Sequence, residues 1–417
     1  MQSKPADSQD GVDVDYTQIE ADLYHFHHID NSLTVQQRLH HQIIHKQALL
    51  KTGLVPNNLA GFEKYEKYSQ LMDMAANGLQ PFSKSTFTPN RGVGDFRRET
   101  QHRRLRHTIA QHIKKLQVQG RCVILPKLEL DGVEGVHVSA LHVASKAADS
   151  KGRPCVDATH SGLNDGTDID ALTSHLGEFK LPQLRALARM LEKARKCGHK
   201  LLHKTDVSSA FNTMLLSPAA ALLQIFQFGD LLVIPLVAGF GWNAAPAYYN
   251  VIAGAIHWAH NGGISPTQLD TWTITQGRTP HPRPRDHTGR SITYVDDSCG
   301  HSSTVSVDSD MGDIQTVISQ LLGPAAYNKK KTEGPLPVMT IIGWKCDLRV
   351  YTIQPGSKGQ CKMYYWVFRG LDPAVHMPLT ALQSAVGTLR WYSAVVPMAS
   401  TWELQRVLTT AQRRQSQ

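Results

Sequence analysis

The stretch SITYVDDSCG, residues 291–300, narrows the fold more than any other part of the sequence. Its residues from Ile292 to Val295 favour a β-strand, and Asp296 and Asp297 follow at a predicted turn. Two adjacent carboxylates at a hairpin tip repel each other, so a cation is needed to keep both ionised. A divalent metal ion is the natural cation, and an ordinary Asp-rich turn is the alternative for this segment alone.

A second acidic position, Asp206, lies far upstream in KTDVSSAF, residues 204–211. Leu201 and Leu202 come before it and predict that Asp206 ends a strand. The two acidic positions can meet only through tertiary folding. Carboxylates from separate strands that meet in this way can bridge two metal ions and support in-line phosphoryl transfer, which is the chemistry of polymerases.

The segment FGWNAAPAYYN, residues 240–250, lies between the two acidic positions. Gly241 allows the backbone to come close to a ligand, and Ala244 and Ala245 before Pro246 predict a turn into a helix. A tight packing corner is the alternative interpretation of the same residues.

Taken in order, these segments resemble the reverse transcriptases of retroelements. The segment FGWNAAPAYY, residues 240–249, and the stretch LQSAVGTLRWYSAVVP, residues 382–397, look closer to Gypsy-like or DIRS-type retrotransposons than to retroviruses. The family has an Asp-x-x-x-Ala-aromatic motif, a Gly-turn-Pro motif and a Tyr-x-Asp-Asp motif, which correspond to Asp206–Phe211, Gly241–Pro246 and Tyr294–Asp297. The segment from Ile341 to Leu348 resembles the primer-grip motif. The resemblance covers residues 115–348, and more loosely the helices expected up to residue 412.

The resemblance implies RNA-directed DNA polymerase activity, with the primer 3′-hydroxyl attacking the nucleotide and pyrophosphate leaving. It implies a site for two Mg²⁺ ions, or Mn²⁺ in their place, at Asp206, Val207, Asp296 and Asp297. In YNKKKTEG it implies that Lys330 or Lys331 protonates the pyrophosphate. These lysines complete the expected catalytic set.

The resemblance also implies a nucleotide-binding site. Its expected members are the phosphate-binding cations Lys146 and Arg153, together with Phe211, Phe240 and Gly241. Phe211 is expected under the sugar, where its ring would collide with a 2′-hydroxyl and select deoxynucleotides. RNA-directed RNA polymerases place a second Asp near this position and use Gly-Asp-Asp, and neither occurs here. A core aromatic is the alternative role for Phe211.

The expected fold class is α+β, with a right-hand polymerase fold of fingers, a palm with an antiparallel sheet, and a partial helical thumb. The expected parts are a disordered acidic tail at 1–23, a His-rich N-terminal extension at 24–95, fingers at 96–200, a palm at 201–350 and a partial thumb or connection at 351–417. Within the palm range, residues 212–238 are expected to belong partly to the fingers, and residues 261–290 to be a loop insertion.

Hydrophobic periodicity predicts four helices outside the motifs. They are a basic amphipathic helix within Arg97–Arg121, a packing helix at Pro182–Cys197, and two helices at Leu379–Ala394 and Thr401–Gln412. The first is either a solvated surface helix or a contact for the template backbone.

Composition agrees with an ordered globular protein, and its basic charge indicates either a polyanionic partner or a charge that only keeps the protein in solution. Apolar residues make up 41% of the chain and the net charge is +9. The six cysteines form no CxxC pair, and the acidic N-terminus is unlike a secretion signal, so we expect reduced thiols in the cytoplasm or nucleus. No apolar stretch is long enough to cross a membrane.

The expected partners are an RNA or DNA template with its primer and deoxynucleoside triphosphates. The sequence leaves the oligomeric state open. No protease, RNase H or integrase signature is evident, so we expect a fragment of a retrotransposon polyprotein or a domesticated copy. The alternatives are a catalytically inactive nucleic-acid-binding remnant and an RNA polymerase.

Overall fold

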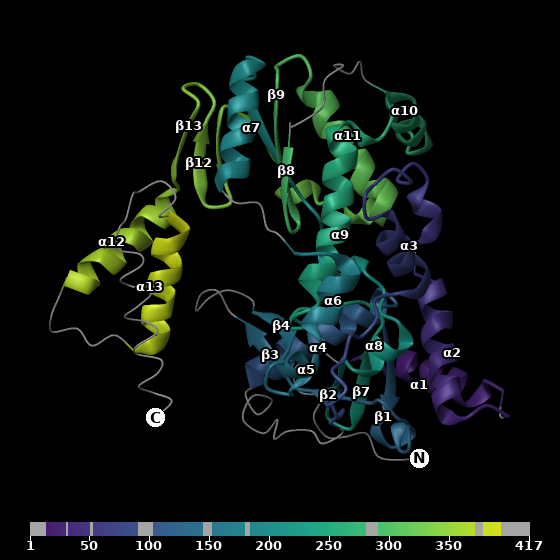
Figure 1. Cartoon of the computed structure of the whole chain (residues 1–417). Helices are drawn as coiled ribbons and strands as arrows, with labels where there is room; N and C mark the ends of the chain where they lie inside the picture. Colours follow the sequence, from purple (N-terminus) through teal and green to yellow (C-terminus); the bar gives the residue numbers. More distant parts are fainter. Residues whose placement is uncertain are drawn as a thin grey trace.

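The computed structural model describes residues 14–30, 32–50, 53–90, 103–144, 152–179, 184–280, 291–371 and 378–392. Helices and mostly antiparallel sheets are combined in it, which confirms the α+β class (Figure 1). None of the helices in these ranges is long and apolar enough to cross a membrane. All six cysteines lie within them and are free thiols.

The N-terminal part is helical: α1 (Tyr16–His28), α2 (Val35–Ala48), the short 3₁₀ helix η1 (Pro56–Leu59) and α3 (Tyr68–Asn77). The expected disordered tail at 1–23 is therefore wrong from Tyr16 onward, while residues 1–13 lie outside the described residues. Asp15 caps α1 by accepting a hydrogen bond of 3.2 Å from the Gln18 backbone N–H.

A buried carboxylate explains why this acidic segment folds. Asp22 is 2% exposed, forms an ion pair with Lys46 of α2, and accepts a hydrogen bond of 3.2 Å from the Ile124 backbone N–H. The acidic pattern that suggested a solvated tail thus contains one residue that joins α1 to α2 and to a strand far along the chain.

A four-stranded sheet in the order β1-β7-β6-β2 and a hairpin β3-β4 form the next part. The strands are β1 (Cys122–Pro126), β2 (Val138–Ser139), β3 (Leu141–Ala144), β4 (Arg153–Val156), β6 (Ile225–Phe228) and β7 (Leu231–Pro235). The helices are α4 (Arg103–Val118), α5 (Leu163–Gly166), α6 (Ile169–Leu176), α8 (Pro218–Leu222) and the 3₁₀ turn η3 (Lys127–Leu130). The helix predicted within Arg97–Arg121 is confirmed as α4, which packs on β1, β3 and β4.

A second antiparallel sheet in the order β10-β5-β9-β8 carries the acidic motifs. Its strands are β5 (Leu201–Asp206), β8 (Ser291–Tyr294), β9 (Asp297–Ser302) and β10 (Glu333–Leu336). Three helices, α7 (Leu184–Lys196), α9 (Ala245–Trp258) and α11 (Val307–Leu322), pack against it. The predictions of a packing helix at Pro182–Cys197 and of a helix after Pro246 are confirmed as α7 and α9.

Part of the expected loop insertion at 261–290 is helical. After the π-helical turn η5 (Ala259–Gly263), α10 spans Pro266–Thr275. The Ser265 side chain caps α10, and Leu269 and Trp272 are buried in the main core, so burial and capping hold this segment in a helix. Residues 281–290 lie outside the described residues.

The C-terminal part contains a three-stranded sheet and two helices. The strands β11 (Val338–Ile341), β12 (Trp344–Asp347) and β13 (Thr352–Pro355) are antiparallel, and α12 (Ser357–Leu371) and α13 (Leu379–Tyr392) follow. The predicted helix at Leu379–Ala394 is confirmed, and the one at Thr401–Gln412 lies outside the described residues. A second core joins α7 to β5, β8, β9, β11 and β12.

Candidate active site

The pairing of β5 with β9 brings the distant acidic motifs together. Asp206, the last residue of β5, lies directly opposite Asp297, the first residue of β9. The Val207 backbone N–H donates a hydrogen bond of 3.0 Å to the Asp296 carbonyl, which holds the strand end against the turn. Opposite residues in an antiparallel pair have Cα atoms about 4.5–5.5 Å apart. The predicted convergence of the two motifs is confirmed.

The turn between β8 and β9 consists of Val295 and Asp296. Val295 has a φ angle of +52°, which is strongly disfavoured for a β-branched residue. Tyr294 and Asp297 pair across the base of the turn, so the hairpin holds Val295 in this conformation. Strained residues of this kind cluster at functional sites.

Basic side chains contact two of the three carboxylates. The Lys331 Nζ lies 3.0 and 3.1 Å from the two carboxylate oxygens of Asp206, which is 4% exposed. The Asn328 side-chain amide donates a further hydrogen bond of 2.7 Å to Asp206. Lys204, on the same strand as Asp206, has its Nζ 3.3 Å from the carboxylate of Asp297 on β9.

Burial raises the pKa of Asp296 and of Asp297. The charges of nearby carboxylates raise both values further, while Lys204 lowers them. A further cation would therefore stabilise the ionised form of these carboxylates. Carboxylate oxygens are the ligands that Mg²⁺ prefers, so Asp206, Asp296 and Asp297 fit a divalent ion chemically. Among the described residues, however, no three His, Cys, Asp or Glu side chains are already grouped as a metal-binding cluster.

A group of aromatic rings lies next to the carboxylates. Phe211, in the 3₁₀ turn η4 (Ala210–Thr213), is partly buried against the main core. Its ring centroid is 5.2 Å from that of Phe240 and 5.9 Å from that of Tyr249. Phe240 remains 41% exposed, so the Phe211–Phe240 pair borders solvent as well as the core.

Tyr249 of α9 lies behind these rings and is fully buried. Burial raises its pKa well above the ordinary value, and the charges of Asp296 and Asp206 add to this effect. Its hydroxyl is buried and has no hydrogen-bond partner among the described residues. The phenol is therefore neutral, and its hydroxyl is an unused hydrogen-bond donor within the electrostatic reach of Asp296 and Asp206.

The loop that holds Phe240 is fixed to β4 and α5. Gly241 has a φ angle of +114°, and a Cβ atom there would lie 1.8 Å from the Val156 carbonyl oxygen. The Val156 backbone N–H donates 2.9 Å to the Phe240 carbonyl, and the Asn164 amide donates 2.9 Å to the Gly241 carbonyl. The close approach that Gly241 allows is thus to the protein's own backbone, which supports the packing-corner interpretation at this residue.

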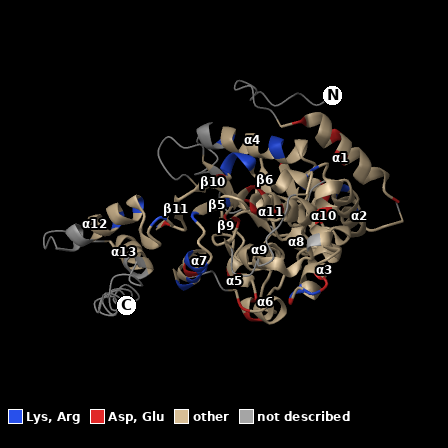
Figure 2. Ribbon diagram, turned by 90° about the horizontal axis from the view of Figure 1, so that it is seen from above, with Lys and Arg blue, Asp and Glu red and all other residues tan. Residues whose placement is uncertain are grey.

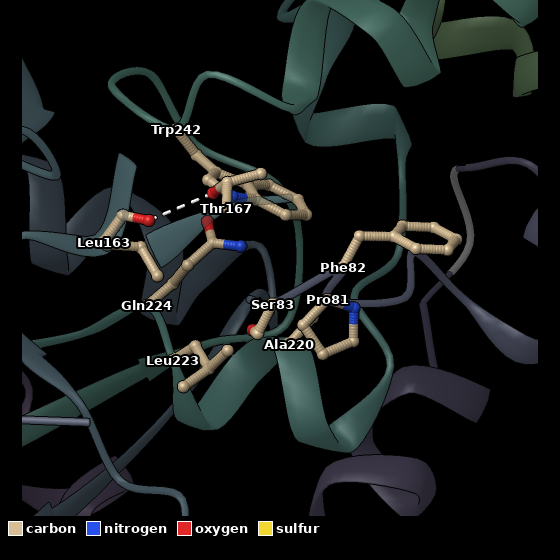
Figure 3. Close-up of a pocket in the computed structure, with 9 residues that line it drawn as sticks. All are labelled: Pro81, Phe82, Ser83, Leu163, Thr167, Ala220, Leu223, Gln224 and Trp242. Carbon is tan, nitrogen blue, oxygen red and sulfur yellow. Dashed lines mark hydrogen bonds between the residues drawn. The ribbon is translucent and has the colours of Figure 1, made fainter. Parts of the chain in front are cut away.

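The buried side chain of Trp242 anchors the same loop. Figure 3 shows its ring beside Thr167 and Gln224, in a narrow cavity of about 10 Å³ that they line together with residues from the segment 81–83 and α8. The Thr167 hydroxyl donates 3.0 Å to the Leu163 carbonyl at the edge of this cavity. The cavity is close to the minimum size for one water molecule, so the side chains around Trp242 pack with almost no empty space.

The remaining predicted residues are placed as follows. Lys146 lies outside the described residues. Arg153 begins β4, next to the Phe240 loop, and the orientation of its side chain is not described. Lys330 is exposed in the 3₁₀ turn η7 (Lys329–Lys331) and, unlike Lys331, makes no contact with Asp206. Val207 is buried, which leaves its backbone carbonyl as the only ligand it could offer.

Sequence reasoning missed three residues of the site: Asn328, Lys204 and Tyr249. Lys204 has a simple signal, because it is two residues before Asp206 on a strand and therefore shares its face. Asn328 immediately precedes the lysine triplet, but nothing in the sequence indicates that its amide reaches Asp206. Tyr249 has no signal beyond its position in the helix that follows the Phe240 loop.

Comparisons with known proteins give matches at the level of structure. No protein-family model matches the chain, and no curated protein matches its sequence. A foamy viral protease-reverse transcriptase in complex with dsDNA is 13% identical, with 96% of this chain and 67% of that chain covered and a TM-score of 0.47.

Two related structures also match. The dRH form of the protease-reverse transcriptase with double-stranded DNA is 13% identical, with coverage of 98% and 58% and a TM-score of 0.46. The complex with an RNA/DNA hybrid is 12% identical, with coverage of 98% and 44% and a TM-score of 0.42. The chain thus spans between 44% and 67% of the length of these proteins.

Proposed function

We propose that the chain is an RNA-directed DNA polymerase that extends a primer with deoxynucleotides, and that it derives from a retrotransposon of the Gypsy-like or DIRS type. The observation that carries the proposal is the register that sets Asp206 opposite Asp297, with Asp296 in the turn beside them. Three carboxylates from two motifs far apart in sequence meet at one sheet end, as two-metal phosphoryl transfer requires. Under this proposal the sheet β10-β5-β9-β8 is the palm.

In the proposed reaction, Asp206, Asp296 and Asp297 would hold two Mg²⁺ ions. Bound there, the ions would activate the primer 3′-hydroxyl and stabilise charge on the leaving pyrophosphate. The hydroxyl oxygen would form a bond to the α-phosphorus and lose its proton to solvent water, and the bond from that phosphorus to the pyrophosphate oxygen would break. Lys331 has an ammonium group in contact with Asp206, so it is the better placed of the two candidate lysines to give a proton to the pyrophosphate.

The Phe211–Phe240 pair is the proposed selector for the sugar. The two rings pack together beside the carboxylates, and Phe240 is open to solvent on one side. Under the proposal, the aromatic surface would accept a deoxyribose and would collide with a 2′-hydroxyl. Arg153 and Lys146 are proposed to neutralise the triphosphate, and the basic helix α4 to follow the template backbone.

A catalytically inactive nucleic-acid-binding protein is the second candidate, and one observation favours it. Lys331 and Lys204 already neutralise Asp206 and Asp297 within the protein. If these ion pairs persist when metal is present, the fold would remain and the chemistry would be lost.

Primer extension separates the two candidates. The wild type and Asp296→Asn are compared on an RNA template and on a DNA template, with Mg²⁺ or Mn²⁺ and with deoxynucleotides or ribonucleotides. We expect deoxynucleotide incorporation by the wild type and at least a 100-fold loss in the variant, as is typical when a transition-state interaction is removed. Equal incorporation by both proteins, or none by either, refutes the polymerase proposal.

A further inference from the structure

Helix α7 has one apolar and one basic face. Its apolar residues Leu187, Met190, Leu191 and Ala194 are buried and belong to the second core. On the other side, Arg185 and Arg189 are exposed, one helical turn apart. Figure 2 shows the basic residues gathered along α7. The proposed chemistry does not use these residues.

The apolar face of α7 packs on the side of the palm sheet that bears the carboxylates. It contacts Leu202 of β5 and Cys299 of β9 in the second core. Leu202 and Asp206 are four residues apart on β5, and Asp297 and Cys299 are two residues apart on β9. Side chains separated by an even number of residues lie on the same side of a strand, so these four share one face of the sheet. A ligand of these carboxylates therefore binds on the same face of the sheet as the one against which α7 packs.

The direction of α7 places Arg185 and Arg189 in the half of the helix nearer the carboxylate end of the sheet. Only residues 197–200 connect the last residue of α7 to the start of β5, so the helix runs back along the sheet, antiparallel to β5. Figure 1 shows α7 alongside β9. Thirteen helical residues and six strand residues are both about 20 Å long. Arg185 therefore lies near the level of Asp206, at the opposite end of β5 from Leu201.

The two ends of α7 differ in how their charges are balanced. Near the C-terminal end, Glu192 forms ion pairs with Arg195 at 2.9 Å and with Lys196 at 3.6 Å. Near the N-terminal end, neither Arg185 nor Arg189 has a hydrogen-bond or ion-pair partner within the described residues. Two like charges one turn apart destabilise a helix slightly. The two cations without a partner among the described residues thus lie in the half of α7 that begins at Leu184, away from Glu192.

We propose that Arg185 and Arg189 bind the sugar-phosphate backbone of the nucleic acid that is extended at Asp206, and the proposal rests on the function proposed above. A guanidinium group matches a phosphate geometrically and remains charged at all physiological pH values. The spacing of one helical turn lets the two arginines contact neighbouring phosphates. Backbone contacts of this kind position the duplex and are insensitive to base sequence.

The test measures the salt dependence of binding. The dissociation constant of a primer–template RNA/DNA duplex is measured by fluorescence anisotropy at several KCl concentrations, with no nucleotide present. In Arg185→Gln/Arg189→Gln, we expect the slope of log K against log [KCl] to fall in magnitude by about 1.4–1.8, which corresponds to two lost phosphate contacts. In Arg185→Lys/Arg189→Lys, we expect most of the slope to remain.

The matched control removes the same charge elsewhere. Lys64 and Lys127 are exposed and belong neither to α7 nor to the sheet that carries the carboxylates, so Lys64→Gln/Lys127→Gln should leave the slope within about 0.5 of the wild type. An unchanged slope in the arginine variant, or an equal loss in the control, overturns the proposal. Because no incorporation is measured, a change in slope with an inactive wild type would support the arginine contacts and count against the polymerase proposal alone.

Discussion

Replacement of Lys331 by Gln should make metal binding at the site stronger. In the structure the Lys331 ammonium group contacts both carboxylate oxygens of Asp206, at 3.0 and 3.1 Å, so a metal ion must displace it. The Lys331 side chain is 55% exposed, and exposed ion pairs contribute only about 0.2–1 kcal/mol. Loss of this competition should therefore strengthen binding by a factor of about 1.4–5.

The measurement is a titration of the full chain with Mn²⁺, followed by calorimetry or by the electron paramagnetic resonance of free Mn²⁺, without nucleic acid or nucleotide. Lys330→Gln is the matched control, because Lys330 is the exposed neighbour that does not contact Asp206. We expect its affinity to equal that of the wild type. An unchanged or weaker affinity in Lys331→Gln would refute the idea that this lysine competes with the metal ion.

Three further predictions follow from other contacts. Phe211→Val should raise the incorporation of ribonucleotides relative to deoxynucleotides by about 10-fold or more in competitive primer extension, and unchanged discrimination would contradict its role as selector. Asp22→Ala should lower the free energy of unfolding by about 3–5 kcal/mol in denaturant titrations, whereas Asp22→Leu/Lys46→Met should stay near the wild type; equal losses would show that the ion pair is irrelevant. Burial raises the pKa of Asp296, so the folded state becomes less stable as the pH rises and this carboxyl group loses its proton. Without metal, Asp296→Asn should therefore have a higher melting temperature than the wild type near neutral pH, and this difference should shrink in acid. A difference in melting temperature that does not change with pH would argue against this cause.

The strands and the helices that carry the acidic motifs could be predicted from the sequence because their signals are local. Strand-forming residues before Asp206 and around Ile292, and Pro246 at the start of a helix, need no knowledge of distant contacts. Chemical reasoning supplied the pairing: adjacent carboxylates need a cation, and a distant carboxylate on another strand can share it. The pairing of β5 with β9 then sets Asp206 opposite Asp297.

The errors arose where a distant partner determines the local structure. The segment after Asp15 looked like a solvated tail because Lys46 and the Ile124 amide, which make burial of Asp22 possible, are far away in sequence. In the same way, residues 261–290 were expected to be a loop insertion, whereas burial of Leu269 and Trp272 in the main core stabilises a helix within this range.

The partners of the site were also beyond local reasoning. The contact of Asn328 with Asp206 depends on how the segment after α11 turns back toward β5. The contact of Gly241 with Val156 depends on the packing of the Phe240 loop against β4. Neither is encoded in a short sequence pattern, since each joins two segments that are ordered only by the completed fold.

If the Phe211–Phe240 pair selects the sugar as proposed, the link between the Phe240 loop and β4 has a consequence for how that selection can evolve. The Phe240 carbonyl is bonded to Val156, and Phe240 in turn packs on Phe211, so a small tilt of the β3-β4 hairpin would carry both rings with it. Under that proposal, two sets of positions could change the selectivity: the two aromatic residues themselves, and the residues of β4 that hold the Phe240 loop in place. Variants with substitutions in β4 would keep both aromatic residues and would still discriminate differently between ribonucleotides and deoxynucleotides.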